Sequence, residues 1–213
     1  MESKKNKLEI KILRPFGPSI IKIKMPDEIV IKMNEYVDKI IKDKNKSKEL
    51  DHGSSLAGNV NQEFLLEQEF MKSIKWAEFL ASACSQWVLT DQKKRIQSFS
   101  IIRSWIVRQF KHEYNPVHFH NGHISGVGYL KVPSFLGDTS HEKKKINNNG
   151  RLVLIHGTKN LFSEPTYTIK PEVGDFYMFP NYLLHTVDPF YDTDDERRSV
   201  SFNAKLDDAA VVF

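Results

Sequence analysis

The sequence has little cysteine, no long apolar run and no strong excess of charge. Cys84 is the single cysteine in 213 residues, so no disulfide can form within the chain, and we expect a reducing, cytoplasmic setting. No stretch reaches the roughly 18 apolar residues of a membrane helix, and the lysine-rich segment 1–7 is not followed by an apolar run. We therefore expect no membrane partner and no signal peptide.

The net charge of +4 is small, and many lysines lie before residue 50 or at 143–145. A nucleic-acid-binding face would need clustered basic residues with stacking aromatic side chains. We therefore do not expect a nucleic-acid partner. The 40% hydrophobic and 27% charged residues are ordinary for a globular protein of one domain, and composition does not indicate an oligomeric state.

Residues 8–13 and 19–25 alternate apolar and polar side chains on either side of a turn, which predicts a hairpin. Residues 26–43 then change to helical spacing, with apolar residues at Val30, Met33, Val37, Ile40 and Ile41. A second helix is predicted over residues 62–87. Its apolar stripe is Leu66, Phe70, Ile74, Ala77, Ala81, Cys84 and Trp87. Within that stripe Cys84 is interpreted as a small buried side chain rather than a nucleophile.

From residue 98 onward, short apolar runs alternate with turn residues. Strands are predicted at 98–110, 117–120, 124–133, 151–156, 166–170, 175–180, 184–188 and 198–206, and a solvated loop at 137–150. This pattern predicts a mainly β (α+β) protein, a sandwich, barrel or jelly roll, braced by two N-terminal helices.

The histidines in the segment 115–130 suggest a metal site. His118 and His120 are separated by one residue, so on a strand both side chains would point to the same face. A third histidine, His185, lies far downstream, between Phe179-Pro180 and Pro189. A close pair with one distant histidine suits a first-row metal. The alternative is that these are surface or core histidines with hydrogen-bonded partners.

The order of short motifs around these histidines resembles the Fe(II)- and 2-oxoglutarate-dependent oxygenases. It is most similar to a small branch of bacterial and phage proteins related to prolyl hydroxylases. The resemblance covers about residues 100–206. Its motifs are His118-Phe-His120 leading into 125–130, Gly150-Arg-Leu, Pro171-x-x-Gly174-Asp175, Phe179-Pro180, His185-Thr-Val-Asp-Pro189 and 197–203 (Arg-Arg-Ser-Val-Ser-Phe-Asn).

The resemblance implies a double-stranded β-helix over residues 96–206, with strands and supporting helices in 1–95, together forming a single oxygenase domain, 1–213. It implies Fe(II), 2-oxoglutarate and O2 as cofactor and cosubstrates. The implied activity is that of a dioxygenase, a hydroxylase that couples decarboxylation of 2-oxoglutarate to succinate with oxidation of a substrate C–H bond. The implied substrate is a protein, a peptide or a small molecule, and prolyl hydroxylation is the reaction that we favour.

The resemblance also assigns the metal ligands. His118 and His185 match the two histidines of the family, and His120 stands where most members have a carboxylate. Asp175 or Glu113 could ligate in place of His120. His123 is a weaker candidate, because it would lie past a turn or on the other face of the strand. No catalytic residue beyond the metal ligands is predicted.

The far carboxylate of 2-oxoglutarate needs a cation, which an arginine supplies best. Alternation on a strand places Arg197 on one face with Ser199, Ser201 and Asn203, and Arg198 on the other face with Val200 and Phe202. Because the first face is polar, we assign Arg197, Ser199 and Asn203 to the cosubstrate. Tyr129 matches a family tyrosine that adds a hydroxyl group to the same carboxylate.

Two other classes of function use the same histidines. One is a non-catalytic, cupin-like β-sandwich that holds a metal or small ligand; such a site has no need of an inward arginine. The other is a zinc hydrolase with His118, His120 and His185 around an activated water. That alternative leaves Arg197 unexplained. Residues 45–61 and 134–150 carry no motif that names a substrate.

Overall fold

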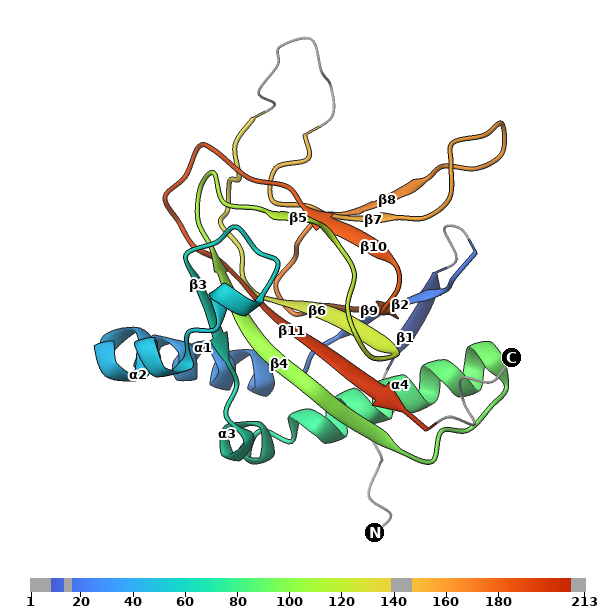
Figure 1. Ribbon diagram of the computed structural model, residues 1–213, viewed down its shortest axis with the longest axis horizontal. Helices are drawn as coiled ribbons and strands as arrows, with labels where there is room; N and C mark the ends of the chain where they lie inside the picture. Colours follow the sequence, from blue (N-terminus) through green and yellow to red (C-terminus); the bar gives the residue numbers. More distant parts are fainter. Residues whose placement is uncertain (1–8, 14–16, 139–146, 208–213) are drawn as a thin grey trace.

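The computed structural model describes residues 9–13, 17–138 and 147–207. In this part of the chain the strands form two antiparallel sheets that face each other (Figure 1). The large sheet has the order β1-β2-β9-β6-β11-β4-β3, and the small sheet the order β5-β10-β7-β8. The strands are β1 (Ile10–Leu13), β2 (Ile20–Lys24), β3 (Gln62–Leu65), β4 (Phe99–Gln109), β5 (Asn115–His118), β6 (Ile124–Lys131), β7 (Leu152–Ile155), β8 (Thr166–Ile169), β9 (Asp175–Pro180), β10 (Leu184–Val187) and β11 (Arg197–Leu206).

The strand order confirms the predicted mainly β fold with a double-stranded β-helix core. Strands far apart in sequence are neighbours: β11 lies between β4 and β6, and β10 lies between β5 and β7. The hairpin β1-β2 extends the large sheet beyond β9, and β3 closes its opposite edge beside β4. All strands predicted from residue 98 onward are present, with ends shifted by at most two residues.

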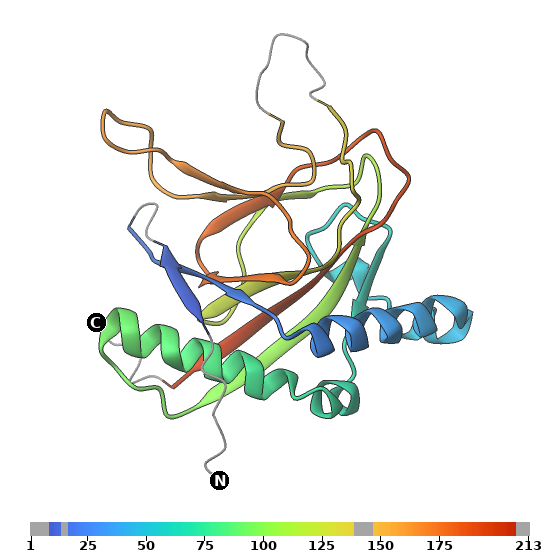
Figure 2. The same ribbon diagram turned by 180° about the vertical axis from the view of Figure 1, so that it is seen from behind.

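The helices cover the face of the large sheet that is turned away from the small sheet (Figures 1 and 2). They are α1 (Asp27–Lys42), α2 (Lys44–Leu50), α3 (Gln68–Ser73) and α4 (Trp76–Gln92), with a short 3₁₀ turn, η1 (Gly53–Ser55). Among the described residues, no helix combines the length and the apolar character that crossing a bilayer would require.

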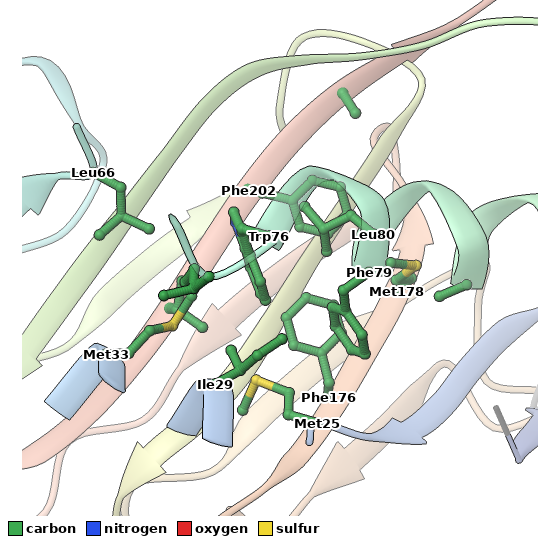
Figure 3. Close-up of a cluster of buried hydrophobic side chains, with 14 of the residues drawn as sticks. Met25, Ile29, Met33, Leu66, Trp76, Phe79, Leu80, Phe176, Met178 and Phe202 are labelled. Atoms are coloured by element: carbon green, nitrogen blue, oxygen red, sulfur yellow. The ribbon is translucent and has the colours of Figure 1, made fainter. Parts of the chain in front are cut away.

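The larger hydrophobic core lies between these helices and the large sheet. Trp76 and Phe79 of α4 meet Phe176 of β9 edge-on, with ring centroids 5.6 and 5.7 Å apart, and Phe202 of β11 stacks on Phe176 (Figure 3). A second cluster lies between the two sheets, and it includes Leu152, Leu154, Phe179 and Val187. The helices therefore brace one face of the large sheet and leave its other face to the small sheet.

Two glycines let these rings approach strand β6. A Cβ atom on Gly126 would lie 2.6 Å from Cε1 of Phe202 and 2.6 Å from the carbonyl oxygen of Tyr177. A Cβ on Gly128 would collide with the ring of Phe176. Both positions require glycine because aromatic rings and a neighbouring strand occupy the space of a side chain.

The prediction of one helix over residues 62–87 is wrong in its first part. Gln62–Leu65 is the edge strand β3, and the helical residues are divided by Lys75, whose backbone is left-handed with φ of 55°. The buried face of α4 is also shifted: Ala77 is exposed and Ala81 half-buried, whereas Trp76, Phe79, Leu80 and Ala83 are buried. Helix α2 was not predicted, and residues 139–146 of the predicted loop lie outside the described residues.

Candidate metal centre and ligand cavity

The three histidines named from the sequence converge between the sheets. His118 on β5 and His185 on β10 are direct partners in the small sheet. Their ring centroids are 4.2 Å apart, and that of His120 lies 4.8 and 4.9 Å from them. One ligand atom from each residue lies within 4.8 Å of the others. This separation is small enough for the three nitrogens to face one ion.

His120 is positioned by a turn rather than by the strand, because β5 ends at His118. The backbone N–H of His120 donates to the carbonyl of Asn181 at 3.0 Å, and the amide Nδ2 of Asn181 donates to the carbonyl of His120 at 2.8 Å. The ring of Trp105 packs edge-on against the imidazole, 5.7 Å between centroids. The position of His120 therefore does not come from a strand face shared with His118, as expected. It comes from the two hydrogen bonds with Asn181.

Two of the imidazoles are oriented by backbone carbonyl groups. Nδ1 of His118 lies 2.7 Å from the carbonyl oxygen of Pro116, and Nδ1 of His185 lies 2.9 Å from that of Leu183. Nδ1–H donates in each bond, which leaves the lone pair of Nε2 free for a metal. Nε2 of His185 lies 3.2 Å from Nε2 of His120, so the free nitrogens face one another.

Burial keeps these histidines neutral. It lowers the pKa of His120 to about 3 and that of His185 to about 4, assisted by the neighbouring imidazoles, and it lowers the pKa of His118. A metal ligand must be deprotonated. The three side chains are therefore in the ligating state at neutral pH, and three imidazole nitrogens suit a divalent first-row metal.

The alternative carboxylate ligands are engaged elsewhere. Asp175 is paired with Lys22 at 2.6 Å and with Lys24 on strand β2. Glu113 accepts hydrogen bonds from the backbone N–H groups of Asn61 and Phe110. Among the described residues, the single group of metal-ligating side chains consists of the three histidines.

His123 is also outside this group. Its Nδ1 accepts a hydrogen bond from the backbone N–H of Leu206 at 3.0 Å.

Arg197 is buried in the wall of the cavity that the histidines also line, and some of its N–H donors have no partner among the described residues. It is 2% exposed, its Nη1 donates to Oε1 of Gln109 at 2.9 Å, and its guanidinium carbon lies 5.1 Å from the ring centroid of Tyr129. Its Nε and Nη2 and the hydroxyl group of Tyr129 have no hydrogen-bond partner among the described residues. Unpaired buried donors are costly. An anionic ligand that accepts from these atoms would remove that cost.

A cavity of about 520 Å³ joins the histidines to the polar face of β11. Arg197, Ser199, Ser201 and Asn203 line it, together with all three histidines. Tyr129 does not line the cavity; it is fully buried and contacts Arg197. Burial raises the pKa of Tyr129 to about 12, so its hydroxyl group stays protonated.

Asn203 accepts a hydrogen bond from Ser125, and it lies six residues from Arg197, about 20 Å along an extended strand.

Arg198 points to the opposite face of β11, as the alternation predicted. Its guanidinium binds Glu196 and Asp38 of α1, at 2.7 and 2.8 Å. It is as deeply buried as Arg197, but its partners among the described residues are Asn34 and Asp38 of α1 and the neighbouring Glu196. This arginine ties β11 to α1 and leaves the cavity to Arg197.

Gln109 is a site residue that the sequence analysis missed. Its Nε2 donates to the carbonyl groups of Glu113 and Asp188, at 2.6 and 3.2 Å, so its Oε1 is turned toward Arg197. A signal was available, since Gln109 lies four and two residues beyond Trp105 and Val107 on β4 and both line the cavity. Alternation alone would have placed it on the same face.

The comparisons with known proteins agree with this geometry. Residues 103–203 match the model of a family described as putative 2OG-Fe(II) oxygenase. No curated protein matches the chain in sequence.

Solved structures share the fold at low identity. A prolyl-4-hydroxylase from Pseudomonas putida has 12% identity and a TM-score of 0.56, with 88% of this chain and 91% of that chain covered. The viral collagen prolyl hydroxylase vCPH from Paramecium Bursaria Chlorella virus-1, in complex with 2OG, has 15% identity and a TM-score of 0.52, with 87% and 94% covered. The epimerase SnoN of nogalamycin biosynthesis has 11% identity and a TM-score of 0.58, with 87% and 76% covered.

The matched segment runs from β4 to β11 and contains the three histidines, Gln109 and Arg197. Enzymes of this family use Fe(II), 2-oxoglutarate and O2. Residues 103–203, just under half of the chain, are thus similar to the 2-oxoglutarate- and Fe(II)-dependent oxygenases, and the chain shares the fold of the solved prolyl hydroxylases.

Proposed function

We propose that this protein is an active Fe(II)- and 2-oxoglutarate-dependent dioxygenase, a hydroxylase that couples decarboxylation of 2-oxoglutarate to succinate with oxidation of a substrate C–H bond. The observation that carries the proposal is the pairing of two features in one cavity. Three neutral imidazoles face one point, and a buried arginine with unpaired donors lies behind them. A structural metal site explains the histidines but not Arg197.

His118, His120 and His185 would hold the iron through Nε2. The carbonyl groups of Pro116 and Leu183 fix the rings of His118 and His185. When bound, iron with 2-oxoglutarate and O2 supplies the oxidising power, and 2-oxoglutarate leaves as succinate and CO2 while the substrate gains a hydroxyl group. The chain's own task is to orient these partners and to exclude water, which the buried walls of the cavity favour.

Arg197 would bind the far carboxylate of 2-oxoglutarate through Nε and Nη2, with Gln109 holding its third nitrogen in place. The hydroxyl group of Tyr129 would donate to the same carboxylate, and Ser199, two residues along β11, lies within reach of it. Asn203 is about 20 Å from Arg197 along the strand, farther than one short dicarboxylate spans. We therefore assign Asn203 to the substrate end of the cavity.

The finer assignment is prolyl hydroxylation of a protein or peptide. The similarity to the two prolyl hydroxylases supports it, while the similarity to an epimerase shows that this fold also serves other reactions. We further propose that residues 1–213 form one oxygenase domain, with the core in 96–206. The single cysteine supports a cytoplasmic location, and burial raises the pKa of its thiol to about 12, which makes Cys84 unreactive.

The test is succinate formation from 2-oxoglutarate with Fe(II) and O2, followed by mass spectrometry of proline-containing peptides. Wild type is expected to release succinate slowly alone and faster with substrate. His185→Ala is expected to lose both iron binding and turnover. Full iron affinity in that variant, or no succinate from iron-loaded wild type, would contradict the proposal. His123→Ala is the matched control, because His123 binds the backbone of Leu206 instead.

A further inference from the structure

One buried carboxylate in the ligand cavity has no role in the proposed reaction. Glu63 on β3 is 1% exposed and lines the same cavity as the three histidines. Its Oε2 has no hydrogen-bond partner among the described residues. A buried carboxylate without a partner is costly to keep ionised.

The other buried acids of the described chain each contact a cation or backbone N–H groups. Glu196 binds Arg108 and Arg198, and Asp175 binds Lys22 and Lys24. Glu113 accepts two backbone N–H groups. Glu63 is the exception, and it is also the one acid among these that lines the cavity.

The charges that act electrostatically on Glu63 are negative. Asp51 and Glu113 act on it electrostatically, and together with burial they raise its pKa to about 7. No ion pair joins Glu63 to a cation in the described ranges. The loop that follows η1 lies over it, since a Cβ atom on Gly58 would come within 3.1 Å of both carboxylate oxygens. The surroundings therefore favour a positive partner. Arg103 and Arg197 line the same cavity, but neither forms an ion pair with Glu63.

The register of the large sheet separates Glu63 from the proposed cosubstrate site. Glu63 pairs with Val107, Val107 with Ser199, and Ser199 with Tyr129. Three strand spacings lie between Glu63 and Tyr129, about 14 Å. Glu63 thus lies on the edge strand β3, and a ligand group that reaches it leaves Arg197 free for 2-oxoglutarate.

We propose that Glu63 forms a substrate subsite for an ammonium or guanidinium group, and that the substrate of this enzyme carries such a cation. A lysine or arginine of a peptide and a small amine offer the same chemistry. That the bound cation belongs to a substrate rests on the proposed function. Binding of a cation at Glu63 does not itself require turnover. An ionised carboxylate forms its strongest hydrogen bonds with these donors, and neutralising it removes the cost of its burial.

The test measures binding to the full chain by tryptophan fluorescence, with Trp105 in the cavity wall as the reporter. The probes are short proline-containing peptides that differ at one position, Lys, Arg, norleucine or Glu, and hexylammonium against hexanol. The wild type is expected to bind cationic probes at least about tenfold more tightly than their neutral counterparts. The peptide and amine arms distinguish the two sources of the cation.

Glu63→Gln is expected to abolish this preference, and Asp51→Asn to keep it. Asp51 is the matched control, because it belongs to the same group of acids but is exposed and does not line the cavity. A wild type without preference for either cationic probe overturns the proposal, as does a preference that survives in Glu63→Gln. Should Glu63→Gln not fold, Glu63→Asp retracts the carboxylate and is expected to weaken the preference; an unchanged preference overturns the proposal.

Succinate formation is measured in parallel. Turnover without cation preference contradicts the subsite proposal but agrees with the proposed function. Cation preference without turnover contradicts the proposed function but agrees with the subsite proposal.

Discussion

His120 changes the electrostatics of the proposed iron site. With a carboxylate in its place the ligand set would carry one negative charge, and with three neutral imidazoles it carries none. An Fe(II) centre held in this way would be one unit more positive, which favours the dianionic 2-oxoglutarate. The buried donors of Arg197 that have no partner among the described residues favour the same anion, because they can bind the carboxylate of 2-oxoglutarate that is far from the iron.

Substitution of His120 tests whether it is a ligand. Loss of a residue that only orients a metal ligand weakens metal binding roughly tenfold to a hundredfold. His120→Ala is expected to weaken Fe(II) binding by more than that, because a ligand itself is lost. His120→Asp rebuilds the common ligand set and is expected to retain part of the affinity. Calorimetric titration with Fe(II) under anaerobic conditions measures both, and wild-type affinity in His120→Ala would remove this residue from the site.

The two adjacent arginines should separate affinity from stability. Arg197→Ala is expected to raise the KM for 2-oxoglutarate about tenfold to a hundredfold, since a charge-assisted fork is lost. Arg198→Ala is expected to leave KM near wild type but to lower the free energy of unfolding by about 3–5 kcal/mol, because Glu196 then stays buried with one partner fewer. Steady-state kinetics and urea unfolding check the pair. A larger KM effect at Arg198 would contradict the register of β11.

Glu63 should make the stability of the free protein depend on pH. Its pKa rises from an ordinary 4.5 to about 7 on folding, so the folded state holds the proton more tightly. The stabilisation that this provides is present below pH 4.5 and is lost as the pH rises through 7. Glu63→Gln, neutral at every pH, is expected to exceed wild type in stability at pH 8 by up to about 3 kcal/mol, and to match it near pH 4. Urea unfolding at both pH values measures this.

Glu196 supplies the opposite sign as a control. Hydrogen bonds from Arg198 and Arg108 outweigh burial and lower the pKa of Glu196, so its ionised form stabilises the fold. Glu196→Gln should therefore destabilise the protein at pH 8. A Glu63→Gln variant that loses stability at pH 8 would show that the ionised Glu63 is paired.

At the scale of elements, strand β6 depends on having no side chain at two positions. Gly126→Ala is expected to lower the free energy of unfolding by about 1–3 kcal/mol or more, because the added methyl group meets Phe202 and the backbone of Tyr177 at once. Gly53→Ala is the control, since its Cβ would find neighbours only at 3.4 Å and beyond. Thermal unfolding of both variants decides it. Equal stability would mean that the Phe202 ring moves freely, against its stacking on Phe176.

Some elements could be predicted from the sequence and others could not. The hairpin β1-β2 and helix α1 were predictable because each has one buried face and so a clean period in its apolar residues. Residues 62–65 mislead because they directly precede Leu66, the first residue of the predicted helical stripe, with no turn residue between them. Their strand state depends on pairing with β4, a contact 40 or more residues away. No local signal shows that Lys75 divides the helix.

The site itself was predictable where a motif fixed it and not where packing did. The histidines and Arg197 stand in short motifs with a fixed order. The amide orientation of Gln109 depends on carbonyl groups of Glu113 and Asp188, one of them 79 residues away. Glu63 has no ion-pair partner among the described residues because the segments that pack around it place no cation within reach of its carboxylate. Such features follow from the assembled fold and leave no pattern in the chain.

At the scale of the whole molecule, the core and the proposed site occupy different spaces. The larger core packs helices on one face of the large sheet, while the histidines lie between the two sheets on the other. Removal of metal should therefore leave the protein folded. What metal and 2-oxoglutarate add is stabilisation by binding to the folded state, about 2.7 kcal/mol for a ligand at 100 times its Kd.

Thermal unfolding can read out both halves of the site in one experiment. Fe(II) or another divalent first-row metal, under anaerobic conditions, is expected to raise the Tm by about 5–10 °C at 100 times its Kd, and a chelator should return the Tm to its starting value without unfolding the protein. Addition of 2-oxoglutarate should raise the Tm again. His185→Ala should lose both increments, since the cosubstrate binds through the metal as well as through Arg197. Arg197→Ala should keep the first increment and lose most of the second. A second increment of full size in Arg197→Ala would show that the buried guanidinium serves the fold rather than the cosubstrate.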